Sequence, residues 1–240
     1  MRIALIIPAA GRGERLGAGR PKAFVEFAGD SLLGHALGNA LASGVIDVVG
    51  IAHPPSIDQR DLYVDLMSRI SAGQVSGRRR KPAELVLTIG GTTRRESVSA
   101  VLATLPGEVD AVLVHDAARC LTPPDVFSAV AAALAAGADA VVPALPVADT
   151  IKEVSGDVVT RTLDRVSLRA VQTPQGFGKD VLVRAHAEVA GDVSDDAGMV
   201  EQLGLKVHVV PGHPEAFKIT DPIDLMLAEA VLAGRASRVR

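Results

Sequence analysis

Short apolar runs and helical patterns alternate along the whole chain, and this alternation constrains the fold more than any other feature. Segments with apolar residues at helical spacing lie between the runs, at Leu32–Leu41, Leu62–Ile70, Val98–Leu105 and Val126–Leu134. The runs predict buried strands at Ile3–Ile7, Val48–Ala52, Leu85–Ile89, Ala111–Val114 and Ala140–Val142. Continuously apolar strands need cover on both faces. We therefore predict an α/β fold: a Rossmann-like open, mostly parallel, twisted sheet with helices on both faces.

Helix boundaries and the later part of the chain follow the same logic. Ser31 is a plausible N-cap for the first helix, Gly44 would stop it, and Pro123-Pro124 would open the fourth. The second half predicts strands at Leu168–Thr173 and Val207–Val210, and helices near 180–189, 195–203 and 222–233. We see no internal repeat and no linker, so residues 1–240 are expected to form one domain.

The alternation breaks after Pro146. Thr150–Val154 and Val158–Leu163 alternate with period two around Ser155-Gly156-Asp157, which predicts a β-hairpin with no helix to cover it. An isolated hairpin is barely stable in water. We therefore expect an arm of about residues 147–166 that packs on a second subunit, making a homodimer.

Composition excludes several classes of protein. Aromatic residues make up only 2% and the net charge is −3, which argues against a nucleic-acid-binding protein. The single cysteine, Cys120, excludes a disulfide framework and a multi-cysteine zinc site, and fits a reducing cytoplasm. The chain enters a strand at once without a signal peptide, and no apolar run reaches the length of a membrane span. We therefore predict a cytoplasmic location and no membrane partner.

The first predicted strand leads directly into Pro8–Gly17, followed by Pro21-Lys22. Small residues let backbone N–H groups approach a ligand closely, and nucleotides bind at this end of such sheets. The spacing matches neither the Walker loop nor the dinucleotide fingerprint. The loop therefore predicts either a cradle for a triphosphate or a plain glycine-arginine surface loop.

Further motifs follow the other predicted strands. Gly90–Ser97, His115–Arg119 and Thr173-Pro174-Gln175 are each either functional or structural turns, and Lys218 is either a ligand or an exposed solubilising residue. Together the motifs have a chemical logic, because strand ends of a parallel sheet share one edge. Nucleotidyl transfer needs cations on separate loops that neutralise phosphates, and it needs no protein nucleophile. The sequence offers such cations and lacks a nucleophile-plus-base motif.

The chain resembles the 2-C-methyl-D-erythritol 4-phosphate cytidylyltransferase family over almost its whole length. Motifs that match in order are Ala9–Leu16 with Pro21-Lys22, Gly90–Val98, Val112–Arg119, Thr173–Gln175 and Lys218–Thr220. The resemblance implies a reaction in which CTP and methylerythritol 4-phosphate, a sugar-alcohol phosphate, give the CDP-linked product and diphosphate. It also implies Mg²⁺, held mainly through the CTP phosphates with no protein metal site, and a dimer whose arm reaches the partner's site.

The resemblance implies a role for each matching residue. The catalytic set would be Arg15, Lys22 and Lys218, which would hold the phosphates. The nucleotide-binding set would be Ala9, Ala10, Gly11, Gly91, Thr92, Ser97, Asp116 and Ala117. The substrate-binding set would be Arg119, Thr150, Arg165, Thr173 and Ser194. Thr92 stands where the family often has Asp, and Ser194 where Thr is common; both keep a hydroxyl.

Two other functions stay open at this stage. A cytidylyltransferase acting on ribitol 5-phosphate would share the fold and the CTP loops. A non-catalytic nucleotide-binding regulatory protein would share the fold but would have no need for all of the cations and the carboxylate.

Overall fold

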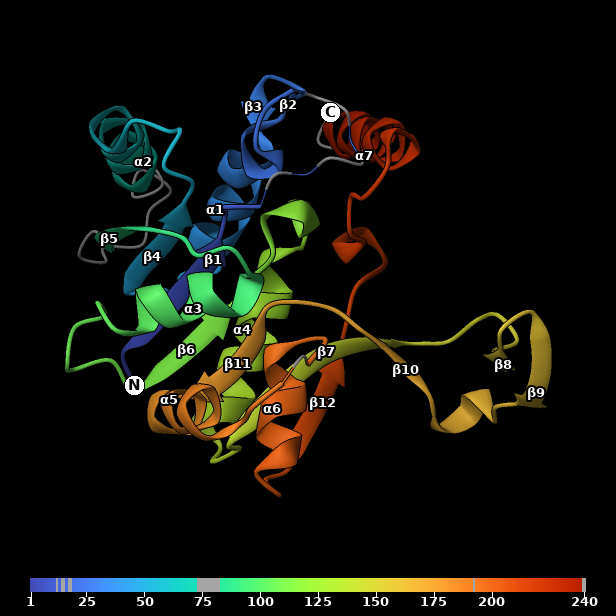
Figure 1. The fold of residues 1–240 in the computed structure, drawn as a ribbon. Coiled ribbons are helices and arrows are strands. Elements are labelled where there is room, and N and C mark those ends of the chain that lie inside the picture. The colour runs from blue at the N-terminus through green and yellow to red at the C-terminus, as the bar shows by residue number, and fades with distance from the viewer. Residues whose placement is uncertain (12, 14–15, 17–18, 73–82, 192, 239–240) are drawn as a thin grey trace.

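The structure, a computed structural model, describes residues 1–240 apart from 12, 14–15, 17–18, 73–82, 192 and 239–240 (Figure 1). The predicted catalytic residue Arg15 and the basic run at 78–81 lie outside the described residues. The main sheet has the strand order β10-β7-β11-β6-β1-β4-β5, with β12 paired to β7. Its strands are β1 (Ile3–Pro8), β4 (Val48–His53), β5 (Glu84–Ile89), β6 (Ala111–Val114), β7 (Ala140–Pro146), β10 (Arg169–Val171), β11 (Gln175–Gly178) and β12 (Val207–Pro211).

Alternate residues of the strands face two separate helix layers. Ile3, Leu5 and Ile7 of β1 belong to one apolar cluster, whereas Ala4 and Ile6 belong to another. The first cluster includes residues of α1 (Leu32–Ala42), α2 (Gln59–Ala72) and α4 (Pro124–Ala135). The second includes residues of α3 (Arg94–Leu102), α5 (Lys179–Glu188) and α6 (Asp196–Gln202). The predicted α/β architecture with helices on both faces is confirmed.

The final helix, α7 (Pro222–Arg238), packs outside these two layers. Leu225 and Ala228 join Leu32 and Ala36 of α1 in a third cluster. Figure 1 shows α7 beside α1 and the small hairpin of β2 (Glu26–Phe27) and β3 (Asp30–Ser31). This position brings the segment just before α7 to the upper edge of the sheet, where β1 ends.

Several predicted boundaries are confirmed. The Ser31 hydroxyl accepts a hydrogen bond from the N–H of Gly34 at 3.0 Å and caps α1. Gly44 follows that helix with a positive φ of 70°, which a glycine adopts at little cost. Helix α4 begins at Pro124, as the proline pair predicted. The third helix instead begins at Arg94, because Thr93 caps it there.

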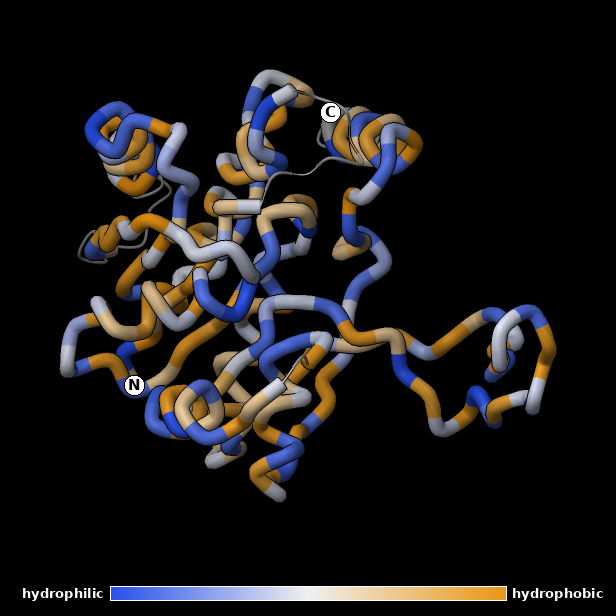
Figure 2. Tube along the Cα trace, in the orientation of Figure 1, coloured by the Kyte–Doolittle hydropathy of each residue, from blue (hydrophilic) through white to orange (hydrophobic). Residues whose placement is uncertain are grey.

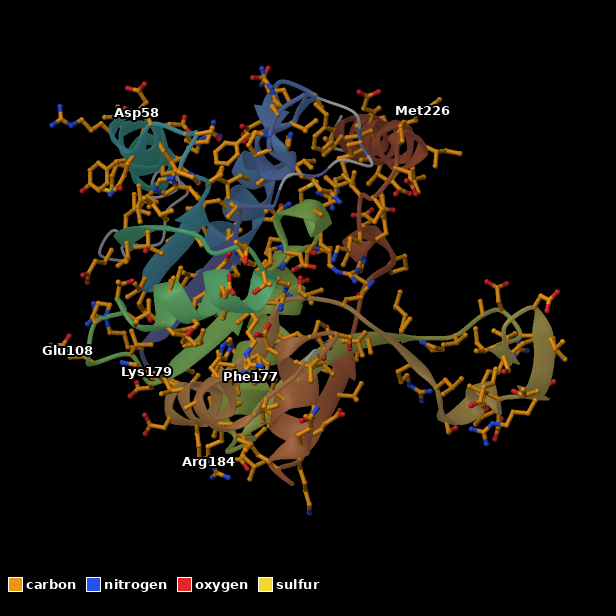
Figure 3. All side chains as sticks on the ribbon, in the orientation of Figure 1. Asp58, Glu108, Phe177, Lys179, Arg184 and Met226 are labelled. Atoms are coloured by element: carbon orange, nitrogen blue, oxygen red, sulfur yellow. The ribbon has the colours of Figure 1, made fainter. Side chains whose placement is uncertain are left out.

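The strand predicted at Leu168–Thr173 is wrong in part. It covers only β10, and the strand that enters the sheet between β6 and β7 is β11, antiparallel to both. Gly176 and Gly178 obscure the strand pattern. A Cβ at Gly176 would lie 2.4 Å from Cγ1 of Val130, so helix α4 packs against bare backbone there. Phe177 points to the other face, where it is fully buried among residues of α5 and α6 (Figure 3).

The predicted hairpin is present and projects from the body as an arm (Figure 1). It consists of β8 (Lys152–Ser155) and β9 (Val158–Thr162), and every residue of both strands is exposed. Figure 2 shows hydrophobic residues along this arm. Val154, Val158 and Val159 of its two strands have exposed fractions of 53–64%. The body of the same chain therefore leaves the arm's apolar surface uncovered.

Within the described part of the chain, we find no helix that combines the length and the apolar character needed to span a membrane.

Candidate active site

A cleft of about 1010 Å³ lies at the carboxyl ends of the parallel strands β1, β4, β5 and β6. Its described walls come from the four segments that follow these strands and from the segment before α7. They are Pro8–Gly11, Gly13, Pro21–Ala23, Pro54–Ser56, Gly90–Arg94, Ser97, Asp116–Ala118, Lys218 and Thr220. A pocket of this size at this edge is typical of nucleotide sites in open α/β folds.

The glycine-rich loop places Lys22 in the cleft wall. The N–H of Ala9 donates to the carbonyl of Ala52 at 2.8 Å, which fixes the loop where it leaves β1. The N–H of Lys22 donates to the carbonyl of Gly11 at 3.2 Å, which holds Lys22 beside the start of the loop. Gly13 has a φ of 67°, and a Cβ there would lie 2.3 Å from Cβ of Lys22. Glycine is therefore required at position 13 for the lysine stem to lie where it does.

The second glycine motif meets the first across the cleft. A Cβ at Gly90 would lie 2.4 Å from Cβ of Ala10, so the bare backbone of Gly90 packs against the methyl group of Ala10. The N–H and hydroxyl of Thr92 both donate to Oε2 of Glu96, at 2.6 and 2.7 Å, and these bonds lower the pKa of that carboxyl. They also fix the start of α3, whose N-terminal end carries a partial positive charge toward the cleft.

His115 and Thr173 form the support beneath Asp116. The backbone N–H of Asp116 donates to Oγ1 of Thr173 at 3.1 Å, and that hydroxyl lies 2.9 Å from Nδ1 of His115. His115 is fully buried, and burial lowers its pKa to about 4. The imidazole is therefore neutral near pH 7 and packs edge-on against Phe127 as part of the core.

Asp116 lies between two cations. Its Oδ2 accepts from Nζ of Lys218 at 2.8 Å, and its Oδ1 accepts from Nε of Arg94 at 3.1 Å. Burial alone would raise the pKa of Asp116, but the charges of Arg94 and Lys218 outweigh it and hold that pKa well below its ordinary value. Asp116 is thus an ionised carboxylate whose charge is balanced within the protein.

Lys218 is held from both sides by the turn η4 (Ala117–Arg119). The N–H of Ile219 donates to the carbonyl of Ala118 at 2.8 Å, and Ile219 is buried. The guanidinium of Arg119 donates to the carbonyl of Ala216 at 2.7 Å, just before the lysine. These bonds explain how a residue more than a hundred positions from Asp116 comes to lie beside it.

Most of the residues predicted for the site line this one cleft. Lys22 and Lys218 of the predicted catalytic set do so, as do all residues of the predicted nucleotide set: Ala9, Ala10, Gly11, Gly91, Thr92, Ser97, Asp116 and Ala117. The substrate set lies outside the described lining. Arg119 and Thr173 support it from behind, whereas Ser194 is exposed ahead of α6. Thr150 and Arg165 are exposed at the base of the arm, and the guanidinium of Arg165 donates to the carbonyl of Ala148.

Sequence reasoning missed two parts of the cleft. Pro54–Ser56 lines it directly after β4, and the rule that strand ends share an edge could have found it. Arg94 lies inside a motif that was singled out, but its pairing with Asp116 has no local pattern. The arginine became recognisable only once the two strand ends were placed together.

Comparisons with known proteins agree with this geometry. Residues 3–234 match the family model for 2-C-methyl-D-erythritol 4-phosphate cytidylyltransferase. Curated proteins of that name from Streptomyces avermitilis and Saccharopolyspora erythraea are each 50% identical, over 98% and 97% of this chain and 93% and 100% of their own lengths.

Solved structures give the same result. The crystal structure of the enzyme of that name from Thermus thermophilus has a TM-score of 0.74 and 36% identity, covering 96% of this chain and 98% of its own. The 4-diphosphocytidyl-2C-methyl-D-erythritol synthase of Anaerococcus prevotii has a TM-score of 0.79 and 27% identity, covering 97% and 98%. The sequence motifs, the fold and these matches coincide along nearly the whole chain, which belongs to the 2-C-methyl-D-erythritol 4-phosphate cytidylyltransferase family.

Proposed function

We propose that this protein transfers the cytidylyl group of CTP to 2-C-methyl-D-erythritol 4-phosphate, releasing diphosphate, in isoprenoid precursor biosynthesis. One observation carries the proposal beyond family membership. Lys22 and Lys218, from loops almost two hundred residues apart, line a single cleft together with two glycine-rich loops. A cleft with close backbone approach and converging cations suits a triphosphate.

The second substrate supplies the attacking atom. Its phosphate monoester is largely ionised at neutral pH, because the second pKa of such a group is about 6. One of its oxygens attacks the α-phosphorus of CTP in line; the new P–O bond forms as the bond to the β-phosphate oxygen breaks, and diphosphate leaves with the electron pair. No protein base is needed for this step, in agreement with the burial of His115, which lowers its pKa to about 4 and makes it a poor proton acceptor.

The cations offset the repulsion between the two anionic substrates. We expect Lys22 and Lys218 to donate to the phosphate oxygens, where they gain most as charge builds in the transition state. Arg15 is expected to act with them, although it lies outside the described residues. A Cβ at Gly11 would meet nothing within 4 Å, so this loop leaves open space in the cleft, where we expect the nucleotide to lie.

The residues also suit a magnesium ion that arrives with CTP. Among the described residues, no group of three His, Cys, Asp or Glu side chains comes together that could hold a metal ion. Mg²⁺ in nucleotide sites is commonly bound by substrate phosphates and one or two carboxylates. Asp116 is the carboxylate in the described cleft lining. When bound, the ion would neutralise phosphate charge.

A diphosphate-release assay tests the function. Wild-type protein with Mg²⁺ should turn over CTP with methylerythritol 4-phosphate, and much more slowly with ATP, GTP or UTP. Ribitol 5-phosphate in place of the methylerythritol compound distinguishes the alternative sugar. Turnover with ribitol 5-phosphate alone would reassign the substrate, and no turnover of CTP with either sugar would contradict the enzymatic function.

We further infer that the protein is a homodimer through the arm, and that a partner's Thr150 and Arg165 complete the sugar-phosphate site. The inference is supported by the uncovered valines of β8 and β9 and by the distance of the arm from the body in Figure 1. Sedimentation analysis should give a dimer mass. A cytoplasmic location remains part of the proposal.

A further inference from the structure

A chain of charged side chains runs from the cleft into the body of the protein. Nζ of Lys218 lies 2.8 Å from Oδ2 of Asp116, and Oδ1 of Asp116 lies 3.1 Å from Nε of Arg94. The guanidinium of Arg94 also donates to Oδ2 of Asp196 at 2.5 Å. Oδ1 of Asp196 lies 3.2 Å from Nε2 of His186. The chain joins the segment before α7, the end of β6, and helices α3, α6 and α5.

The position of Asp196 sets it apart from the other members. Its exposed fraction is 0%, and it lies outside the described lining of the cleft. Burying a carboxylate costs several kcal/mol unless it is paired. The partners that offset this cost are Arg94 and His186, and through Arg94 the carboxylate is linked to the cleft.

The N-cap of helix α6 does not account for Asp196, which lies in the first turn of that helix. Helix α6 is capped by the preceding residue, Asp195, whose Oδ1 accepts from the N–H of Gly198 at 2.9 Å. Asp195 also accepts from the side-chain amide of Gln175 at 2.7 Å. Two consecutive aspartates thus divide the work: one caps the helix, and the other binds an arginine 102 positions away.

Arg94 needs both of its carboxylates to hold its orientation. Its Nε donates to Asp116 while its terminal nitrogen donates to Asp196, so each carboxylate supplies one of the two hydrogen bonds that fix the plane of the guanidinium. If Asp196 lost its charge, the guanidinium could turn about the bond to Asp116. Asp116 would then lose a fixed partner. The ammonium of Lys218, which donates to Asp116, would no longer be held at one position in the cleft.

We propose that Asp196 is a positioning residue of the transfer reaction, acting through Arg94 and Asp116 to hold the ammonium of Lys218 in the cleft. This role rests on the proposed function and deepens it. Asp196 is buried outside the described lining of the cleft, so it is expected to act through Arg94 without touching a substrate. Its contribution is geometric, so it affects the transition state, where charge must be met at a defined place, more than the binding of CTP by the backbone loops.

The variant Asp196→Asn tests the role because it removes the charge and keeps the shape. We expect kcat to fall by about 10- to 100-fold, since a displacement of about 1 Å can cost up to 10²-fold. The dissociation constant of CTP, measured by calorimetry, should stay within about threefold, because the glycine loops that hold the nucleotide are unchanged. His186→Gln should lower kcat in the same direction by a smaller factor, and it serves if Asp196→Asn fails to fold.

A double-mutant cycle separates positioning from simple stabilisation. In a Lys218→Ala background there is no ammonium to place, so Asp196→Asn should lower kcat by less than about twofold. Asp30→Asn, which breaks an ion pair with Arg69 remote from the cleft, is the matched control and should leave kcat unchanged. Urea unfolding of each variant confirms that the proteins compared are folded.

The outcomes are distinct. Equal factors of loss from Asp196→Asn in the wild-type and Lys218→Ala backgrounds would overturn the positioning role, as would an unchanged kcat or a rise in KM alone. Wild-type protein assayed beside the variants distinguishes a failure of the proposed function from a failure of the positioning role. Failure of the wild type to release diphosphate from CTP overturns the proposed function itself, whereas an active wild type with an unaffected variant overturns only the role of Asp196.

Discussion

The cleft and the arm are held in place by opposite means. In the cleft, both described lysines are held by hydrogen bonds within the body of the chain: the backbone N–H of Lys22 donates to the carbonyl of Gly11, and the ammonium of Lys218 donates to Asp116. In the arm, β8 and β9 pair with each other while both faces stay exposed. The comparison teaches that the body of this chain forms the cleft by itself, whereas it leaves both faces of the arm uncovered.

The largest effect should come from the cations of the cleft. Lys22→Ala or Lys218→Ala should lower kcat by about 10²–10³-fold, because each removes a charge that meets the developing charge of the transition state. Steady-state kinetics measures this. Lys206→Ala, which removes an exposed lysine far from the cleft, is the control. A variant at position 22 or 218 with wild-type kcat would exclude that lysine from the reaction.

The next prediction tests whether the arm completes a neighbouring cleft. Arg165→Ala and Lys22→Ala homodimers should both be nearly inactive. If the arm crosses over, a mixed dimer has one site with both residues intact, so random mixing should restore about a quarter of wild-type activity. Activity that stays at the level of the separate variants would contradict an arm that completes the cleft of a neighbouring subunit.

Acid should destabilise the body through the support beneath the cleft. The folded chain lowers the pKa of His115 to about 4 from 6.5, so between these values the unfolded chain binds a proton that the folded chain does not. The resulting contribution to stability is complete above about pH 6.5 and is lost as the pH falls through 4, about 3 kcal/mol in all.

Urea unfolding between pH 7 and 4 measures this contribution. His115→Gln removes the titration, so its unfolding free energy should fall less steeply with acid than that of the wild type. His208→Gln, which removes an exposed imidazole, is the control and should keep the wild-type slope. Parallel curves for His115→Gln and the wild type would contradict the prediction.

Close packing in the body gives a further contrast with the arm. Gly176→Ala should lower the free energy of unfolding by about 1–3 kcal/mol, because the added methyl group would meet Val130 and Leu134 of α4. Gly38→Ala makes the same chemical change where nothing lies within 4 Å, and it should be neutral or stabilising by up to about 1 kcal/mol. Equal effects at the two positions would mean that α4 yields easily at Gly176.

The smallest change in stability should come from the arm itself. Val159→Asp should change the unfolding free energy of the body by no more than about 0.5 kcal/mol, because the side chain is exposed. It should nevertheless weaken self-association in sedimentation experiments. Val183→Asp makes the same change on an exposed face of α5 and should leave self-association unchanged. A dimer equally strong in both variants would place the interface elsewhere.

Much of the fold and of the cleft could be predicted because the relevant physics is local. Continuous apolar runs such as Ile3–Ile7 can only be buried strands, and parallel strands put their carboxyl ends at one edge. Motifs after β1, β5 and β6 were therefore bound to meet, and the structure places them in one cleft. The hairpin of the arm could also be predicted, because period-two alternation on both sides of Ser155-Gly156-Asp157 is typical of a β-hairpin.

The sequence by itself thus determined the layers, the edge that carries the cleft and the residues exposed along it. Only the tertiary structure decided that β11, and not residues 168–173, pairs with β6 and β7. Glycine at position 176 interrupts the apolar pattern of a strand, and side chains of α4 occupy the space that a Cβ there would take. The tertiary structure also decided the pairing of Arg94 with Asp116 and Asp196. Asp116 lies 22 positions from Arg94 in the sequence and Asp196 lies 102 positions from it, so neither contact produces a sequence pattern. Both contacts exist because the fold brings these charged groups together where burial requires each charge to be paired.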